Sequence, residues 1–200
     1  NANLEKVDQA IKKNRIKPDI PNYETFENYI KKGGYKKIYE IRSGKENWYE
    51  NIVKADLRGL GGAGFRTAKK WELVSKETGP RYLAVNGDEG EPGTFKDKHY
   101  LETEPHMFLE GVLMASIAVS AEKCFIYIRD EYPAILHILG KEITKLEEKK
   151  IVPIGFFDLR RGAGAYICGE ESAMIESIEG KRGLPRHRPP YVGQSGIFGK

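Results

Sequence analysis

The sequence has little cysteine and no long apolar run, and both shortages limit what the protein can be. Only two cysteines, Cys124 and Cys168, occur far apart among 200 residues, which excludes a disulfide framework and a self-contained four-thiolate metal site. No stretch approaches the ~20 consecutive apolar residues of a membrane-spanning helix, and no charged-then-apolar segment resembles a signal peptide. We therefore expect a cytoplasmic protein that does not insert into a membrane.

The charge pattern and the histidines argue against two further classes of partner. The chain carries 33 Lys and Arg against 29 Asp and Glu, a formal net charge of +4. Its aromatic residues are not interleaved with these bases as a nucleic-acid stacking platform requires. The four histidines form no i, i+4 pair or other ligand spacing. We expect neither nucleic acid nor a metal ion as a partner, and a composition that is 40% hydrophobic predicts a globular core.

Glycine, in contrast, is concentrated in one place. Residues 58–71 read Arg-Gly-Leu-Gly-Gly-Ala-Gly-Phe-Arg-Thr-Ala-Lys-Lys-Trp, and we name residues 58–64 the first glycine loop. Four glycines within six positions let the backbone approach a ligand. The helix-forming composition from Phe65 onward brings N–H groups and the positive end of a helix to the same spot. The pattern favours a phosphate or flavin site, with a ligand-free connector as the plain alternative.

The first glycine loop also matches the dinucleotide fingerprint G-x-G-x-x-G, which requires a strand before it. Residues 47–55 instead space Trp48, Ile52 and Ala55 in the i, i+3/i+4 manner of a helix. The loop is therefore predicted to join two helices, which weakens the dinucleotide interpretation.

The alternation of elements from residue 81 onward indicates an α/β fold, with a Rossmann-like, mostly parallel sheet flanked by helices. Strands are expected at residues 81–86, 124–128 and 153–159, and helices at 106–121, 131–149 and 170–179. Before them, residues 1–56 are expected to form an N-terminal helical extension with helices at 4–13, 22–32 and 35–41. Residues 57–200 are expected to form the ligand-binding α/β domain.

Two polar segments follow predicted strands, where ligands of open α/β sheets gather. We name residues 86–97 the acidic turn and residues 161–171 the second glycine loop. Carboxylates accept hydrogen bonds from ribityl or ribose hydroxyls and from flavin or nicotinamide N–H groups. The alternatives are a Mg²⁺-assisted phosphoryl-transfer site, which lacks a Gly-Lys-Ser/Thr sequence, solvated turn acids, and, for Glu170 and Glu171, partners of a helix dipole.

With these three segments in view, the chain resembles the NADH-oxidising flavoprotein subunit of respiratory complex I. That family includes the diaphorase subunits of NAD-reducing hydrogenases and the beta subunits of NAD-dependent formate dehydrogenases. The resemblance rests on residues 58–65 with Lys70-Trp71, on residues 86–94, and on Tyr-Ile-Cys-Gly-Glu-Glu at 166–171. The sequence at residues 165–173 and 186–191 is most similar to the formate dehydrogenase branch. We therefore slightly prefer this branch over the other two.

The resemblance implies an oxidoreductase that passes hydride between NADH and FMN and feeds the electrons to iron–sulfur centres of a larger complex. It implies that Glu91 and Glu171 touch the nicotinamide side and act as the catalytic residues. Phe65 and Tyr191 would hold the adenine. The full set of implied cofactor-binding residues is Gly59, Gly61, Gly62, Phe65, Lys70, Asn86, Asp88, Glu89, Gly90, Tyr166, Gly169, Glu170 and Tyr191.

The same resemblance implies partners and a context. NADH or NAD+ is the expected substrate, and the expected partners are other subunits of a redox complex, notably a thioredoxin-like 2Fe–2S subunit, which could hold the protein at the inner face of a membrane. In the family, a ubiquitin-like domain and a domain carrying a 4Fe–4S cluster follow the region that ends here at Lys200.

Two positions depart from the family pattern. Leu60 stands where complex I members commonly have Arg, and Leu73 stands where an aromatic residue often helps to hold adenine. Because the segment with which the family completes the flavin site is not in this sequence, a truncated, non-catalytic module that binds a nucleotide or another subunit is kept as the alternative function.

Overall fold

A three-stranded parallel sheet forms the centre of the computed structural model, which describes residues 18–45, 47–60 and 62–200. The strands are β1 (Tyr82–Gly87), β2 (Lys123–Ile128) and β3 (Phe157–Arg161), in the order β1-β2-β3. Both pairings are parallel, so the three carboxyl ends meet at one edge of the sheet. The expected α/β fold with a parallel sheet is confirmed.

The central strand β2 is covered on both faces because its side chains alternate between two cores. Ile126 and Ile128 lie in the larger core, whereas Phe125 and Tyr127 lie in a smaller core against α9 (Glu171–Ile178). This double burial explains why the strand is a continuous apolar run instead of an alternating one.

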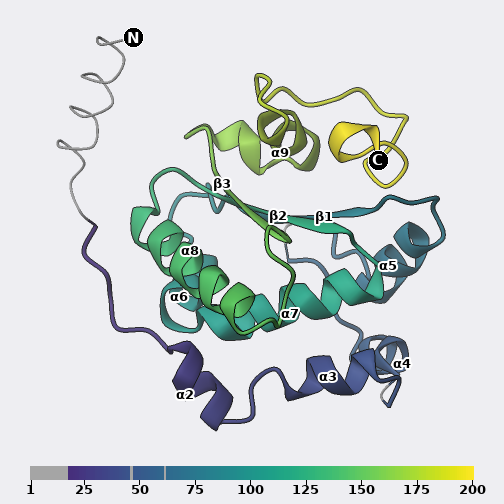
Figure 1. The fold of residues 1–200 in the computed structure, drawn as a ribbon. Coiled ribbons are helices and arrows are strands. Elements are labelled where there is room, and N and C mark those ends of the chain that lie inside the picture. Colours follow the sequence, from purple (N-terminus) through teal and green to yellow (C-terminus); the bar gives the residue numbers. More distant parts are fainter. Residues whose placement is uncertain (1–17, 46, 61) are drawn as a thin grey trace, which may run out of the picture.

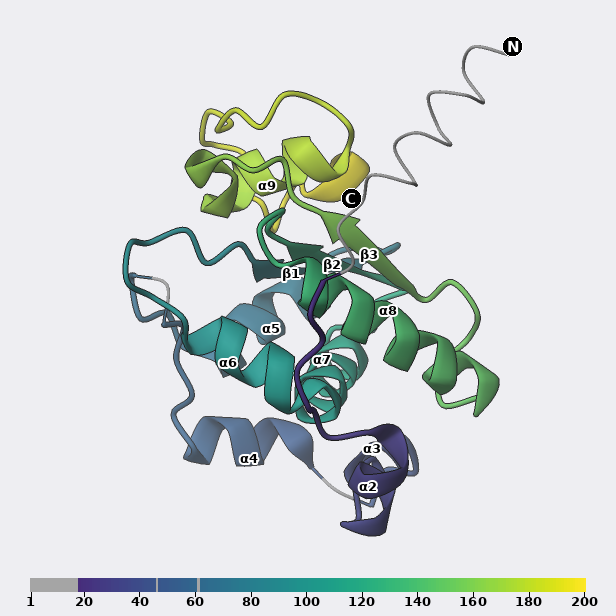
Figure 2. The same ribbon diagram turned by 90° about the vertical axis from the view of Figure 1, so that its left-hand side faces the viewer.

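Helices cover both faces of the sheet (Figures 1 and 2). One face carries α7 (Pro105–Ala118) and α8 (Pro133–Glu148), with α6 (Lys96–Thr103) beside them, and the other carries α9 and the C-terminal segment. Both α7 and α8 start with proline, which fits the first helical turn because its missing N–H has no intrahelical partner. A short 3-10 helix, η1 (Tyr166–Gly169), precedes α9, and a second, η2 (Ile197–Gly199), ends the chain.

The N-terminal helices form a further layer on the side of α7 away from the sheet (Figure 1). This layer contains α2 (Phe26–Lys31), α3 (Lys36–Arg42) and α4 (Trp48–Lys54), and α5 (Thr67–Ser75) leads from it to β1. The buried side chains of Phe26, Tyr35 and Ile38 belong to the larger core. The division at residue 57 stays a prediction about domains, although both parts contribute to that core. The helix expected at residues 4–13 lies outside the described residues.

The strand expected at residues 153–159 is wrong in its position, since β3 spans Phe157–Arg161. Ile151 and Val152 are buried beneath the turn that follows α8, and Gly155 adopts a φ of +75°. A left-handed residue at this point ends the preceding segment in a turn, for which glycine is suited. The first half of this apolar run therefore forms a turn, and only its second half enters the sheet.

Helix α6 is an element that the sequence pattern did not predict. Its neighbouring residue Phe95 provides no side-chain cap. The cap comes instead from Glu89, whose carboxylate accepts hydrogen bonds from the N–H groups of Asp97 and Lys98. Because this residue stands eight or nine positions earlier in the chain, the usual local start signal is missing.

Candidate functional site

The acidic turn and the second glycine loop meet at the carboxyl edge of the sheet. Asn86 lies near the end of β1 at this edge and donates its side-chain Nδ2–H to the carbonyl oxygen of Gly169, 2.8 Å away. Its Oδ1 accepts a hydrogen bond from the N–H of Asp88 at 3.0 Å. One amide side chain thus ties together two segments that are 83 positions apart in the sequence.

Close approach explains two of the glycines at this contact. A Cβ atom on Gly90 would lie 3.1 Å from the Tyr166 ring, and one on Gly169 would lie 3.2 Å from the carbonyl oxygen of Asp88. The Tyr166 hydroxyl also donates to Glu91 Oε1 at 2.5 Å. Larger residues at either glycine would push the two segments apart.

Glu89 is buried, with 6% of its surface exposed, so the solvated-acid alternative is wrong for this residue. Its carboxylate lies 3.0 Å from the N–H of Asp97 and 3.1 Å from that of Lys98. Burial acts to raise its pKa, but these bonds and the Lys96 ammonium outweigh burial and lower the pKa. The side chain caps α6, and the part of Glu89 in cofactor binding stays a prediction.

Asp88 lies in a different environment from its neighbour. It is half-buried, and this burial raises the pKa of its carboxyl group. Arg129 partly opposes that effect, while Glu131 adds to it. A carboxylate held out of water in this way gains from any N–H or hydroxyl donor that a ligand supplies.

The two acids at the start of α9 are held by the helix and by one arginine. Glu170 Oε2 accepts hydrogen bonds from the N–H groups of Ser172 at 3.0 Å and Ala173 at 2.9 Å, as an N-cap residue does. Arg188 pairs with Glu170 and lies 3.0 Å from Glu171. Burial acts to raise the pKa of Glu170, but the capping bonds and Arg188 lower it. Glu170 and Glu171 remain candidates for ligand contact, and they also stabilise the start of α9.

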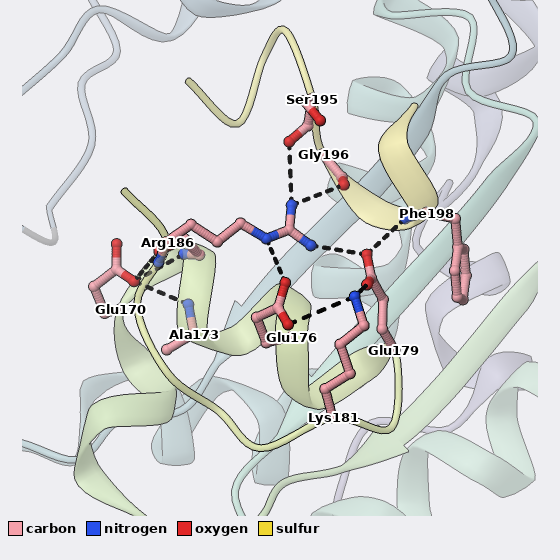
Figure 3. A network of polar contacts seen from close by, with 10 residues as sticks. Glu170, Ala173, Glu176, Glu179, Lys181, Arg186, Ser195, Gly196 and Phe198 are labelled. Carbon is pink, nitrogen blue, oxygen red and sulfur yellow. Dashed lines mark hydrogen bonds and ion pairs between the residues drawn. The ribbon is translucent and has the colours of Figure 1, made fainter. Parts of the chain in front are cut away.

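A polar network beside α9 holds the C-terminal segment (Figure 3). Arg186 Nη2 donates to Glu179 at 2.9 Å, and its Nη1 donates to the carbonyl oxygens of Ser195 at 3.2 Å and Gly196 at 3.0 Å. The Arg186 N–H joins this network to the α9 cap through Ser172 Oγ. A cavity of about 630 Å³ lies around these groups, and none of the predicted site residues lines it.

The first glycine loop is closed on itself and joins α4 to α5. The Gly59 N–H donates to the Phe65 carbonyl at 3.0 Å, and the Thr67 N–H donates to the Leu57 carbonyl at 2.8 Å. Because the helix α4 precedes the loop, the argument against a dinucleotide fingerprint is confirmed. Gly62 has a φ of +140°, which glycine adopts readily.

The structure does not join the first glycine loop to the other two segments. No hydrogen bond or ion pair between described residues links it to the acidic turn or to the second glycine loop, and Gly61 lies outside the described residues. Lys70 is exposed on α5, and it forms no ion pair with another described residue. Phe65 and Tyr191 are also exposed.

Sequence reasoning missed two arginines that hold the site together. Arg188 contacts both acids at the start of α9, and Arg129 Nη1 donates to the carbonyl oxygen of Glu89. Arg129 directly follows the central strand β2, so its place at the carboxyl edge was available as a signal. Neither residue stands in a glycine-rich or acidic cluster, and such clusters were the signals that pointed to the predicted site.

Metal-binding and membrane-spanning features are both missing from the described part of the chain. There, no group of three or more His, Cys, Asp and Glu side chains is arranged to hold a metal ion. Nor does any helix in the same residues have the length and apolar character needed to cross a membrane.

Comparisons with known proteins identify relatives of this chain. The chain is 46% identical over 189 residues to the F subunit of NADH-quinone oxidoreductase from Aquifex aeolicus, covering 90% of this chain and 44% of that protein. It is 40% identical over 191 residues to the F 2 subunit of the same enzyme from Rhizobium meliloti, covering 90% and 45%. The chain thus spans less than half the length of these relatives.

A solved structure and a family match give the same assignment. The NAD+-reducing NiFe-hydrogenase in its H2-reduced state superposes with a TM-score of 0.71 at 44% identity, over 76% of this chain and 27% of that chain. Residues 52–198 match the family described as the Nuo51 FMN-binding domain. The chain therefore belongs to the Nuo51 FMN-binding domain family.

Proposed function

We propose that this chain is the part of an NADH-oxidising flavoprotein subunit that binds FMN and NADH and brings them together for hydride transfer. The observation that carries this proposal is the Asn86–Gly169 hydrogen bond, which joins the acidic turn to the second glycine loop at the carboxyl edge of the sheet. Open α/β sheets bind their ligands at this edge. Membership of an FMN-binding family supports the identity of the cofactor.

The residues at this edge fit a flavin mononucleotide. Gly90 and Gly169 lie where a Cβ would press on Tyr166 or on the Asp88 backbone, so bare backbone is presented there. Asn86 and Asp88 offer oxygens to ribityl hydroxyls and flavin N–H groups. The first glycine loop, through Gly59, Gly61 and Gly62, would hold the phosphate side, and exposed Lys70 would supply a cation.

The protein contributes orientation and electrostatics to the reaction. FMN, when bound, supplies the acceptor for the hydride. Glu91 is held by the Tyr166 hydroxyl and Glu171 by Arg188, so both carboxylates are fixed at the side proposed for the nicotinamide. Fixing the nicotinamide in a reactive orientation lowers the entropic part of the barrier. Phe65 and Tyr191 would stack on the adenine.

The relatives favour a complex I or hydrogenase context. Those reported above are F subunits of NADH-quinone oxidoreductase or belong to an NAD+-reducing hydrogenase, so they give no support to the expected preference for formate dehydrogenase. We propose that the chain works as part of such a multi-subunit complex, with a thioredoxin-like 2Fe–2S subunit among its neighbours. The 4Fe–4S cluster would lie in sequence beyond residue 200.

The proposal is tested by reconstituting the protein with FMN and recording its visible spectrum before and after anaerobic NADH. We expect a yellow protein whose flavin absorbance bleaches on addition of NADH. Glu91→Gln should keep the flavin while slowing the bleaching, because the nicotinamide loses an oriented carboxylate. Glu148→Gln, at an exposed residue at the end of α8 outside the proposed site, is the matched control and should behave as wild type.

Two results would contradict the proposal in different ways. If the reconstituted protein carries no flavin absorbance, it has no FMN site. If FMN binds but NADH causes no bleaching, the protein is the non-catalytic module that the sequence leaves as an alternative.

A further inference from the structure

Arg129, at the carboxyl edge of the sheet, is held by three groups. Its Nε and Nη2 donate to the two carboxylate oxygens of Glu131 at 3.1 and 3.0 Å, and its guanidinium lies 5.1 Å from the centre of the Tyr132 ring. Its remaining Nη1 donates to the carbonyl oxygen of Glu89. A planar guanidinium fixed by a bidentate carboxylate and an aromatic face has little freedom to turn.

Glu89 is consequently held both by its side chain and by its backbone carbonyl. Its carboxylate accepts from the first N–H groups of α6 and from the Tyr132 hydroxyl at 3.4 Å, and its carbonyl accepts from Arg129. The next residue is Gly90, which leaves the Glu89–Gly90 peptide few steric limits of its own. Because a trans peptide directs its C=O and N–H to opposite sides, holding the carbonyl also sets the direction of the Gly90 N–H.

The residues on either side of this peptide are those proposed to meet the ligands. Asp88 precedes it and Glu91 follows it, and the Tyr166 ring lies against Gly90. Releasing the Glu89 carbonyl would therefore loosen the turn that carries both carboxylates. Asn86 holds the start of the acidic turn through its hydrogen bond from the Asp88 N–H, and Arg129 holds the middle through its hydrogen bond to the Glu89 carbonyl.

We propose that Arg129 is a positioning residue, which fixes the orientation of the Glu89–Gly90 peptide and thereby places Asp88 and Glu91 for the flavin and the nicotinamide. Its effect on turnover rests on the proposed function, whereas its effect on the acidic turn does not. Glu131 and Tyr132 support Arg129 and need not touch a ligand.

The chain offers a matched control in Arg42. This arginine ends α3, outside the proposed site, and its Nη1 donates to the carbonyl oxygen of Ile151 at 3.1 Å. Arg129→Gln and Arg42→Gln therefore each remove one positive charge and one hydrogen bond to a backbone carbonyl. Comparing the two variants separates the specific contact with Glu89 from a general loss of positive charge.

The experiment measures amide hydrogen exchange and flavin chemistry in wild type, Arg129→Gln, Arg129→Lys and Arg42→Gln. In the FMN-free protein, Arg129→Gln should speed exchange of residues 88–95 about tenfold or more, since a charge-assisted bond to the backbone is lost. Exchange in β2 and α8 should stay as in wild type. Arg129→Lys, which keeps one charged donor but loses the bidentate pair, should fall between the two.

In the FMN-loaded protein, turnover with NADH and ferricyanide is normalised to bound flavin. We expect Arg129→Gln to bind FMN about tenfold more weakly and to turn over about tenfold more slowly per bound flavin, because orientation is lost. Arg42→Gln should match wild type in both measurements. Normalisation matters, since a purely structural role would reduce the amount of active protein without changing turnover per flavin.

The proposal is overturned if exchange at residues 88–95 is unchanged in Arg129→Gln, if exchange rises equally in β2 and α8, or if Arg42→Gln has the same effect on residues 88–95. If Arg129→Gln does not fold, the same comparison is made with Arg129→Lys. Failure of wild type to bind FMN would overturn the proposed function alone, because the exchange measurements on FMN-free protein still decide the role of Arg129.

Discussion

Asp88 and Glu89 stand next to each other, yet their surroundings shift their pKa values in opposite directions. Burial raises the pKa of Asp88. For Glu89, the N–H groups at the start of α6 and the Lys96 ammonium outweigh burial and lower the pKa. The difference separates their roles, since Glu89 is committed to the helix cap and Asp88 is available to a ligand.

The raised pKa of Asp88 leads to a prediction about pH. The folded protein keeps the proton on Asp88 to a higher pH than the unfolded chain does, so this group favours folding at low pH and loses that contribution as pH rises through the raised pKa. Asp88→Asn should therefore be slightly more stable than wild type near pH 7, with no advantage near pH 3, and should bind FMN about tenfold more weakly. Urea unfolding at several pH values and FMN titrations check both. An identical pH slope in the variant would contradict the assignment.

Gly169 gives a second prediction at this scale. In Gly169→Ala the new methyl group meets the Asp88 carbonyl at 3.2 Å, and backbone cannot move aside as a flexible side chain can. We expect a loss of about 1–3 kcal/mol in the free energy of unfolding and weaker FMN binding. The control is Gly111→Ala in α7, where the added methyl meets open space and should stabilise the protein by about 0.5–1 kcal/mol. Equal effects of the two substitutions would show that close approach is not the reason for Gly169.

At the scale of elements, a buried polar chain joins the N-terminal layer to α7 and α8. His106 Nδ1 lies 2.9 Å from the Tyr35 hydroxyl, and its Nε2 lies 2.9 Å from Glu142 Oε2. Glu142 Oε1 accepts a further hydrogen bond from the Tyr23 hydroxyl at 2.8 Å. His106 and Glu142 are fully buried, so the chain of hydrogen bonds satisfies groups that water cannot reach.

Burial lowers the pKa of His106 despite the neighbouring Glu142. Its folded pKa thus lies below the unfolded value of about 6.5, and its contribution to stability is complete above that value and is lost as pH falls through the folded pKa. His106→Ala should lose about 2–5 kcal/mol in the free energy of unfolding at pH 7, because the substitution leaves a cavity and removes the hydrogen-bond partner of two buried groups, Glu142 and the Tyr35 hydroxyl. Its stability should also fall less steeply than that of wild type as the pH is lowered. Urea unfolding from pH 4 to pH 8 measures both effects. His137→Ala, on the exposed face of α8, should keep the stability of wild type at pH 7.

At the scale of the whole molecule, the N-terminal helices and the α/β part share one core. Phe26, Tyr35 and Ile38 pack in it with residues of β2, α7 and α8. A chain shortened to residues 57–200 loses all three, each worth about 2–5 kcal/mol, against a typical total of about 5–15 kcal/mol. We expect the shortened chain to show no cooperative thermal transition by calorimetry, in contrast to the full chain. A sharp transition would instead support an independent domain that starts near residue 57.

The sequence by itself determined the parallel sheet, the helices between its strands, the helix that precedes the first glycine loop and the family. These features depend on local signals: the apolar period, the position of proline at helix starts, and glycines at fixed spacing. The tertiary structure alone decided that α6 exists, that β3 begins only at Phe157, and that Arg129 and Arg188 hold the site. The physical reason is that the cap on α6 and the contacts of both arginines join residues distant in sequence, so their energies depend on how the chain packs and leave no pattern in neighbouring residues.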